Sequence, residues 1–522
     1  MLKTKNIGLF LGPLSFVLIL FFFHPEGLNP QANAVLASTA WVSIWWITEV
    51  IPIAVTSLLP IILFPLSGAM ELSSTTASFG HKYIFLYMGG FIIAIAIEKW
   101  NLHKRIALNI LRIIGGQPHR LVLGFMIATG FLSMWLSNTA TALMLMPMGM
   151  SLVLLYEELN KDILAGGGRV DPRADNFSLT LLLGIAYGAS IGGFATLIGT
   201  PPNGILITQM SQLFPEAPDI TFATWMLFAL PMSFVYMIIA WVLLTRVVFP
   251  LPASTPFSGK DFINSEIKKL GPMSTEEKRV TGVFVSFALL LMTRKERLFG
   301  PEVDLFGWSH FLDKILTSAG SAPVGYMIDD GSVSIAVALT LFMIPAAAKT
   351  GGRLMDWEDA KRVPWGILLL FGGGLAIAKG FGTSGLSDYI AGQLAAILGN
   401  AEQLVIVMST VAFITGLTEV ASNTATITLA VPIMASLAQA IDAHPLLLLI
   451  PTTLAASCAF MLPVSTPANA IVYGTGRIPI MKMVIAGIWL DILSVFLLTF
   501  FVYTLGHLTF DVLGELPTWA IT

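Results

Sequence analysis

Long apolar stretches without charges limit what this chain can fold into more than any other feature. Hydrophobic residues make up 55% of the 522 residues and charged residues only 11%, whereas a soluble globular chain carries about 25% charged residues. A membrane-spanning helix needs about 20 consecutive apolar residues. The stretches are continuous and lack the short alternating pattern of a barrel strand. The sequence therefore predicts an all-α protein that crosses the membrane several times.

The composition also argues against several classes of site. A single cysteine, Cys458, excludes an intrachain disulfide and a cysteine metal cluster, so we expect it to be a small buried residue. The seven histidines are scattered without the spacing of a zinc motif. The net charge of −3 is small, and no basic block suggests that the chain binds nucleic acid.

The N-terminus resembles a secretion signal at first sight. Two lysines precede an apolar run at 7–23, and a small-residue segment at 32–34 resembles a cleavage site. However, the run is longer than the roughly 7–15 residues of a signal core, and the small residues follow too late. We therefore expect a first transmembrane helix that is retained.

Two polar motifs recur in the same order within apolar surroundings. The tripeptide Ser-Asn-Thr stands at 137–139 and again at 422–424. Gly-Thr-Pro-Pro-Asn follows at 199–203, and Ser-Thr-Pro-Ala-Asn follows at 465–469. One Ser-Asn-Thr alone would be no more than a helix cap. Helix breaks at matching positions of two halves indicate the binding site of a secondary transporter.

The recurrence divides the chain into parts. We assign residues 1–33 to an N-terminal transmembrane helix, 34–250 to a first repeat, 251–330 to a linker, 331–512 to a second repeat and 513–522 to a tail. The linker begins with a charged part that we expect to be cytoplasmic, followed by a short apolar run and a polar excursion.

The charge pattern predicts how the two repeats are oriented. The segment that leads to the first tripeptide is basic, whereas its counterpart at 380–404 contains no lysine or arginine. By the positive-inside rule, the first segment is cytoplasmic and the second is not. The sequence therefore predicts inverted repeats. Each tripeptide would lie at the tip of a re-entrant hairpin, although for 121–136 and 139–156 two full spans remain an alternative. A polar loop is expected at 160–175.

The motifs suit the joint binding of an anion and cations. A helix broken inside the membrane exposes N–H groups, which attract anions, and carbonyl groups, which attract cations. Hydroxyl, amide and backbone oxygens are ligands that hard cations prefer. No lysine or arginine lies within several residues of the motifs, so bound Na+ would have to neutralise a dianion. Two equivalent half-sites suit a solute with a carboxylate at each end.

Three carboxylates in apolar surroundings leave their roles open. Glu49 could be functional within the membrane, or it could cap a helix break before Pro52 or lie at the interface beside the tryptophans at 45 and 46. Glu419 adjoins the second tripeptide and could tune cation binding or face a water-filled path. No partner for Asp491 can be named from the sequence.

At these motifs the chain resembles the divalent anion/sodium symporter family, the Na+-coupled dicarboxylate carriers. The resemblance covers nearly the whole chain and includes Trp-Trp-Ile-Thr-Glu at 45–49 and both tripeptides. It implies a homodimer in which each protomer has a scaffold domain and a transport domain. It also implies two re-entrant hairpins with the tripeptides at their tips and an elevator-type movement.

The resemblance also implies the site residues, motif by motif. The first Na+ site would use Ser133, Ser137, Asn138 and Gly199, and the second would use Thr418, Ala421, Asn423 and Ser465. The substrate carboxylates would meet Ser137, Asn138, Thr139, Thr200, Pro201, Ser422, Asn423, Thr424, Thr466 and Pro467. Ser133 and Thr418 each precede their tripeptide serine by four residues, about one helical turn, which independently supports the assignment. The last motif lacks the doubled proline, so the ligands of the second site are less defined.

These features predict a symporter that moves C4 dicarboxylates such as succinate, malate or fumarate with Na+ as the coupling ion. It would be a multi-pass protein of the cell membrane, in a bacterium the inner or plasma membrane. A Na+-independent dicarboxylate exchanger of the same family is the closest alternative. A sulfate carrier and an anion channel are further ones. An enzyme is not expected, because no paired nucleophile and base lies near the motifs.

Overall fold

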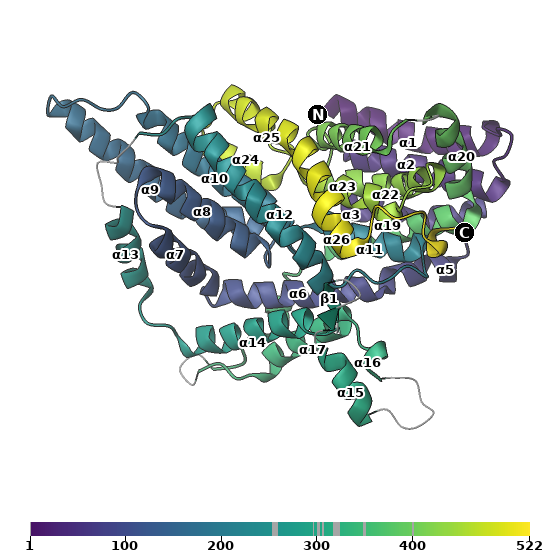
Figure 1. The fold of residues 1–522 in the computed structure, drawn as a ribbon, viewed down its shortest axis with the longest axis horizontal. Coiled ribbons are helices and arrows are strands. Elements are labelled where there is room, and N and C mark those ends of the chain that lie inside the picture. The colour runs from purple at the N-terminus through teal and green to yellow at the C-terminus, as the bar shows by residue number, and fades with distance from the viewer. Residues whose placement is uncertain are drawn as a thin grey trace.

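The computed structural model describes residues 2–252, 259–295, 297–299, 303–304, 307–316, 324–347, 351–398 and 401–521. Helices form almost all of this structure (Figure 1). Up to residue 248 they are α1 (Leu2–Phe22), α2 (Pro30–Thr48), α3 (Ile53–Thr56), α4 (Leu59–Ser67), α5 (Leu72–Ala77), the 3-10 turn η1 (Ser78–Gly80), α6 (Lys82–Lys99), α7 (Leu102–Ile114), α8 (Pro118–Ser133), α9 (Asn138–Ala165), α10 (Ala174–Gly193), α11 (Pro201–Leu213), α12 (Phe222–Val242) and the π-helical turn η2 (Leu243–Val248).

The rest of the described chain is also mainly helical. It contains α13 (Gly259–Leu270), α14 (Thr275–Met292), the short strands β1 (Arg297–Phe299) and β2 (Val303–Asp304), α15 (Trp308–Leu316), α16 (Val324–Met327), α17 (Asp330–Met343), α18 (Trp357–Ala360), α19 (Trp365–Ser384), α20 (Leu386–Leu398), α21 (Gln403–Thr418), α22 (Asn423–Ala440), α23 (Pro445–Ala455), α24 (Pro467–Tyr473), α25 (Ile480–Phe501), the π-helical turn η3 (Val502–Gly506), α26 (His507–Phe510) and the 3-10 turn η4 (Thr518–Ala520). The two strands form one antiparallel pair.

By length and composition, six helical segments of the described chain could cross a membrane. They are Leu72–Lys99, Asn138–Ala165, Ala174–Gly193, Phe222–Val248, Trp365–Ser384 and Ile480–Phe510. Shorter apolar helices accompany them, among them Asn6–Phe22 within α1. The prediction of a helical protein with several spans is thus confirmed.

The first helices differ in their limits from the predicted ones. The helix α1 ends at Phe22, and α2 begins at Pro30, so the expected boundary at residue 33 falls inside α2. Asn29 begins α2 because its Oδ1 atom accepts a hydrogen bond from Ala32 N at 2.8 Å, and proline suits the first helical position.

Glu49 lies where α2 ends. Its backbone is left-handed, with φ 46° and ψ 45°, and its side chain is exposed. Pro52 then precedes α3, and proline disfavours helical conformation in the residue before it. The structure therefore favours the interpretation that Glu49 ends a helix before Pro52.

The predicted polar loop at 160–175 is wrong in its first part, because α9 continues to Ala165. The last nine residues of α9, 157–165, include two glutamates, two leucines, a lysine and an alanine, all of which favour helix. The chain leaves the helix only at three consecutive glycines, and Gly167 has a φ of 77° that glycine adopts without strain.

The helix in the linker is longer than the short apolar run that was predicted there. That run is the second part of α14, which begins after a capping box formed by Ser274 and Glu277. The Glu277 carboxylate also accepts two hydrogen bonds from Arg105 of α7, at 2.9 and 3.1 Å. This bidentate pair ties the linker to the first repeat. Part of the following polar excursion, 293–330, lies outside the described residues.

The helix α10 forms the centre of the first repeat and is buried almost throughout. Its closest neighbour is α8, and glycines make the approach possible. A Cβ atom on Gly192 would lie 2.2 Å from Gly130 Cα, and one on Gly188 would lie 2.8 Å from Met126 O. Small residues allow membrane helices to pack this closely. The break after α10 is therefore held deep in the protein.

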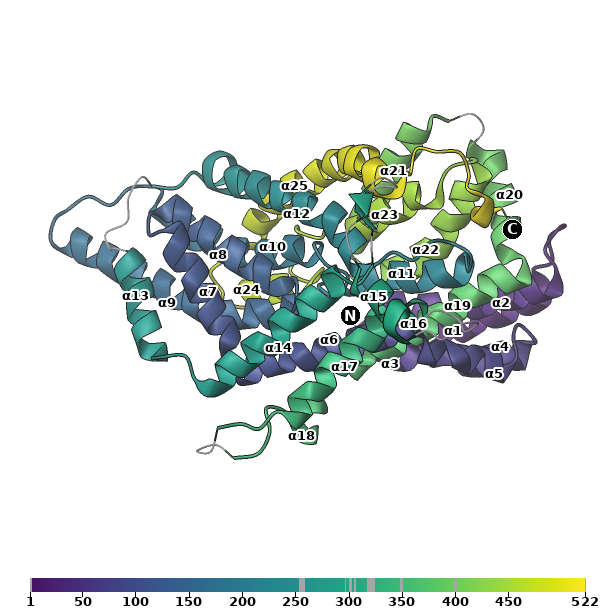
Figure 2. The same cartoon turned by 60° about the horizontal axis from the view of Figure 1, so that its bottom comes forward.

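The helices of the molecule form two groups, and the helix after each break packs against the group that lies farther from it along the chain. Figures 1 and 2 show α7–α10 on one side of the molecule and α1, α2, α19, α20 and α22 on the other. The helix α24 of the second repeat packs against α9 and α10, whereas α11 of the first repeat packs against α19 and α22. The short helix after each break thus packs against helices of the other repeat.

Candidate functional site

All four polar motifs stand at the start of a helix. The residues at the N-cap positions are Ser137 before α9, Thr200 before α11, Ser422 before α22 and Thr466 before α24. Ser137 Oγ accepts a hydrogen bond from Ala140 N at 3.2 Å. Thr466 Oγ1 accepts one from Asn469 N at 3.1 Å. The first N–H groups of a helix have no partner within the helix and can bind carboxylates. The starts of α11 and α24 offer fewer such donors, because Pro201, Pro202 and Pro467 have no N–H.

The two hairpin tips have the same local geometry. Ser133 Oγ donates a hydrogen bond to Asn138 Oδ1, and Thr418 Oγ1 donates to Asn423 Oδ1 at 2.7 Å. In both repeats the hydroxyl belongs to the last residue of the first hairpin helix, and the amide belongs to the first residue of the second. The structure therefore brings together the predicted ligands Ser133 with Asn138 and Thr418 with Asn423.

In the first repeat, the helix break folds directly onto the hairpin tip. A Cβ atom on Gly199 would lie 2.5 Å from Gly193 O and 2.9 Å from Ser133 O. A Cβ atom on Gly193 would lie 2.7 Å from Asn138 Oδ1. Both positions require glycine, because any side chain would enter this contact. Backbone and amide oxygens converge here without a fixed positive charge, and such oxygens are suitable ligands for Na+.

In the second repeat, the break is tied to the hairpin by a carboxylate. Glu419 accepts hydrogen bonds from Met461 N at 2.9 Å and from Leu462 N at 3.0 Å, and only 2% of the residue is exposed. Thr418 Oγ1 also lies 2.8 Å from Ala456 O. Glu419 therefore satisfies two backbone donors that the broken helix leaves free.

The other predicted ligands of the second Na+ site are less closely assembled. Ser465 Oγ donates to Leu462 O at 2.6 Å and belongs to the break. Ala421 lies in the turn between α21 and α22, where its N–H donates to Leu417 O at 3.1 Å. Within the described chain, no hydrogen bond joins Ser465 or Ala421 to Asn423. This fits the difference between the last motif and the first one.

Asp491 remains without a hydrogen-bond donor. It lies on α25 and is 6% exposed, and neither carboxyl oxygen has a hydrogen-bond partner among the described residues. Nearby hydroxyls are used elsewhere, since Tyr187 donates to Phe460 O and Tyr236 to Leu490 O, each at 2.8 Å.

Two asparagines that sequence reasoning did not assign hold the breaks in shape. Asn203 Nδ2 donates to Thr196 O at 2.8 Å and also lies 3.3 Å from Gly193 O. Asn469 Nδ2 donates to Ala459 O at 3.0 Å and to Leu462 O at 3.1 Å. Both side chains are fully buried. The sequence does contain a pattern that indicates these residues, because asparagine is the fifth residue of both break motifs.

We expect that Asn203→Ala and Asn469→Ala each weaken Na+ binding, because carbonyl groups of the break lose their donor and the unwound segment loosens. An unsatisfied buried polar group costs about 1–3 kcal/mol, which corresponds to roughly 5- to 150-fold in affinity. The measurement is the Na+ concentration that gives half-maximal substrate uptake. Asn109→Ala, at an exposed position of α7, is the matched control and should stay within about twofold of the wild type. Unchanged Na+ dependence in both variants would contradict the role of these amides.

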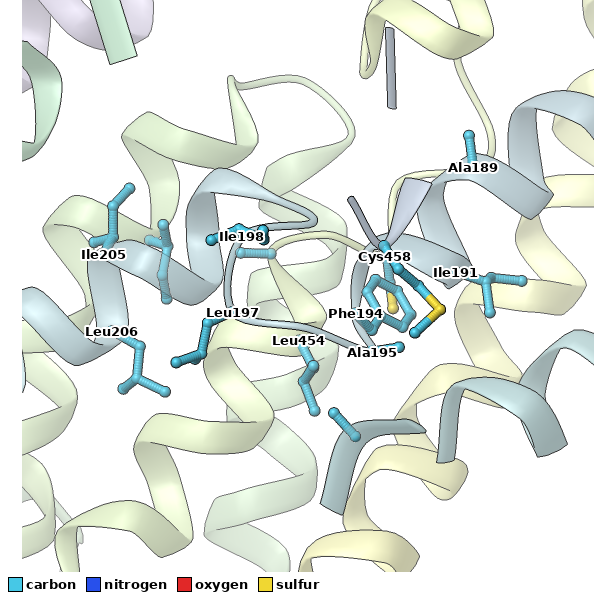
Figure 3. Packing of buried hydrophobic residues seen from close by; sticks show 14 of the residues in the cluster. Ala189, Ile191, Phe194, Ala195, Leu197, Ile198, Ile205, Leu206, Leu454 and Cys458 are labelled. Carbon is cyan, nitrogen blue, oxygen red and sulfur yellow. The ribbon is translucent and has the colours of Figure 1, made fainter. Parts of the chain in front are cut away.

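The two breaks lie next to each other in the protein interior. Figure 3 shows Phe194, Ala195 and Leu197 of the first break beside Leu454 and Cys458 of the second repeat. Cys458 is fully buried, as expected. Hydrogen bonds also cross between the repeats, since Gln209 Nε2 of α11 donates to Thr428 O of α22 at 3.0 Å. The first break and α11 thus lie against helices of the second repeat.

Two solved structures share the overall fold of this chain. The chain aligns with MtrF of Neisseria gonorrhoeae at a TM-score of 0.54 and 15% identity, covering 98% of this chain and 97% of that one. It aligns with the YdaH transporter of Alcanivorax borkumensis at a TM-score of 0.55 and 14% identity, covering 97% and 99%. At these identities the likeness concerns the fold alone.

Sequence relatives are much closer. The chain is 43% identical over 515 residues to the sodium-dependent dicarboxylate transporter SdcS of Staphylococcus saprophyticus, covering 98% of this chain and 93% of the relative. It is 42% identical over 498 residues to SdcS of Staphylococcus aureus, covering 95% and 90%. The family model of the sodium:sulfate symporter transmembrane region matches residues 3–510. The chain therefore belongs to the sodium:sulfate symporter family, the divalent anion/sodium symporters that its motifs resemble.

Proposed function

We propose that this protein is a secondary active transporter that carries C4 dicarboxylates across the membrane together with Na+. The observation that carries the proposal is the pair of matching hairpin tips. In each tip a hydroxyl and an asparagine oxygen meet, at Ser133 and Asn138 and at Thr418 and Asn423. Both tips lie beside a helix break in the interior. The names of the two staphylococcal relatives support the choice of dicarboxylate and Na+.

The cation sites would be built from oxygens of both repeats. We assign the first to Ser133, Ser137, Asn138 and Gly199, and the second to Thr418, Ala421, Asn423 and Ser465. Bound Na+ supplies positive charge beside a dianion in a region where the motifs contain no lysine or arginine. The proposed ligands of the first site are supported by the close approach of the chain at Gly199 to Ser133 O and at Gly193 to Asn138 Oδ1, which leaves no room for a Cβ atom.

The dicarboxylate would lie between the two repeats. One carboxylate would meet Ser137, Asn138, Thr139, Thr200 and Pro201, and the other would meet Ser422, Asn423, Thr424, Thr466 and Pro467. The N-cap geometry of all four helix starts supports this assignment. Solutes of this kind include succinate, malate and fumarate, which carry a carboxylate at each end. If acetate or another monocarboxylate were transported equally well, the paired half-sites would not be the basis of recognition.

Transport would follow an elevator-type movement in a homodimer of the bacterial cell membrane, as the family resemblance implies. The hairpins and breaks would move together relative to a scaffold. A spectroscopic distance between a label on α9 and a label on α17 that stays constant with and without Na+ would contradict this movement. A molecular mass of one chain in light scattering of the purified protein would contradict the dimer.

Uptake of labelled succinate into proteoliposomes tests the proposed function. With an inward Na+ gradient we expect accumulation, and with K+ in place of Na+ we expect only the background rate, because bound Na+ is needed to neutralise the dianion. Unlabelled succinate preloaded inside should not replace the gradient. Uptake that is independent of Na+ but requires internal succinate would mean that the protein is an exchanger. The assigned cation sites would then be wrong.

A further inference from the structure

A basic hollow lies at one end of the first helix group. It has a volume of about 590 Å³ and is formed where α8 and α10 begin and where the π-helical end of α12 stops. Its lining includes Arg120, Arg173 and Arg246, together with His119 and Trp241. These arginines are far apart in the sequence, and the fold brings them to one place.

The positive charge of this hollow is not neutralised within the described chain. No aspartate or glutamate lines the hollow. In the part of the chain that the structure describes, none of the three arginines forms an ion pair, and all three are exposed. Three unpaired guanidinium groups around one cavity therefore favour an anionic ligand.

The wall of the hollow is structured by specific contacts. Trp241 Nε1 donates a hydrogen bond to His119 O at 2.9 Å, which joins α12 to the start of α8. The Arg246 guanidinium lies over the Trp241 ring, 5.8 Å from its centroid. The Trp241 ring thus holds Arg246 in position. The hollow lies where α12 is joined to the start of α8.

The position along α12 indicates where the hollow lies in the membrane. The candidate span Phe222–Val248 ends here, and the basic segments before α8 and in the linker predict the cytoplasmic face on this side. Leu230, Phe234 and Val235 on α12 and Val247 in η2 are exposed. An apolar surface therefore continues from the basic hollow along the span, as a ligand with acyl chains requires.

We propose that this hollow binds the phosphate head group of an anionic phospholipid at the cytoplasmic surface. Arginine pairs well with phosphate through two parallel N–H bonds, and basic pockets between membrane helices recognise anionic lipids. The acyl chains would lie against the exposed apolar residues of α12. Free phosphate shares the head-group chemistry but cannot use that apolar surface.

Lipid titration of the full-length protein tests this proposal. Purified, delipidated protein in detergent is mixed with phosphatidylglycerol, with phosphatidylcholine or with inorganic phosphate, and bound lipid is counted by native mass spectrometry. We expect phosphatidylglycerol to bind at least about tenfold more tightly than phosphatidylcholine, since each basic residue near the surface favours anionic lipid. If the wild type bound the two lipids equally well, this result alone would overturn the proposal, and no variant would be needed. Displacement of phosphatidylglycerol by equimolar inorganic phosphate would also overturn it, because the site would then recognise a free anion.

Substitutions locate the bound lipid. In the combined variant Arg120→Gln, Arg173→Gln and Arg246→Gln, the preference for phosphatidylglycerol should fall at least about tenfold. The matched control changes three exposed basic residues outside the hollow, Lys104→Gln, Arg112→Gln and Lys268→Gln, and should keep the preference within about twofold. An equal loss in both variants would mean general surface attraction and would overturn the assigned site.

Discussion

Replacing Asn138 or Asn423 with alanine should reduce Na+-driven uptake by about 10- to 150-fold, because each substitution removes an oxygen that meets the neighbouring hydroxyl and the proposed cation. A hydrogen bond to a charged group contributes about 1.5–3 kcal/mol, and each 1.36 kcal/mol is a factor of about ten. The initial rate of succinate uptake at a series of Na+ concentrations measures the effect. The Na+ requirement should change more than the maximal rate.

Comparing the two asparagines tests whether the half-sites are equivalent. They make the same contact, Ser133 with Asn138 and Thr418 with Asn423, so the two variants should be impaired to a similar degree. The exposed Asn109→Ala variant should behave like the wild type. If Asn138→Ala transported succinate with unchanged Na+ dependence, the first cation site would have to be sought elsewhere.

Replacing Glu419 with alanine should destabilise the second half-site by about 2–6 kcal/mol, because two buried N–H groups lose their acceptor at about 1–3 kcal/mol each. These are the N–H groups of Met461 and Leu462. Thermal unfolding of the purified protein measures the stability, and succinate uptake measures the functional loss. Glu419→Gln keeps one acceptor oxygen and should lose clearly less stability than Glu419→Ala.

The matched control for this prediction is a glutamate whose partner is at the surface. Glu98 pairs with Arg362 at 2.5 Å, and both side chains are substantially exposed. Such a pair contributes about 0–1 kcal/mol, so Glu98→Ala should unfold close to the wild-type temperature. If Glu419→Ala were as stable as Glu98→Ala, the carboxylate would not hold the break to the hairpin.

The positions of the helix breaks could be predicted from the sequence because their causes are local. Proline at 201 and 467 cannot continue a preceding helix, and a threonine occupies the N-cap position before each of them. The spacing of Ser133 and Ser137 was consistent with one helical turn, but α8 ends at Ser133, and the contact that forms is with Asn138 across the turn. The end of α9 lies later than the polar residues at 160–162 suggest, since lysine, leucine and alanine at 161–165 favour helix.

Contacts that depend on tertiary packing could not be predicted. Nothing near Glu419 in the sequence indicates that its carboxylate will meet Met461 N, more than 40 positions later. The arginines at 120, 173 and 246 come together only because the starts of α8 and α10 lie beside the end of η2. Asn203 and Asn469 are intermediate cases, since their equal places in the two motifs were visible but the bonds that they make were not.

The exchange of α11 and α24 between the helix groups has a consequence for how the chain is made. When synthesis has reached residue 250, α9 and α10 are complete, but α24, which packs against both, is more than 200 residues away. Contacts of such long separation form late in folding. The first repeat therefore cannot complete its tertiary packing in the bilayer until the second repeat has been synthesised. The two halves should become stable only together, whether they are joined by the linker or expressed in the same cell as separate chains.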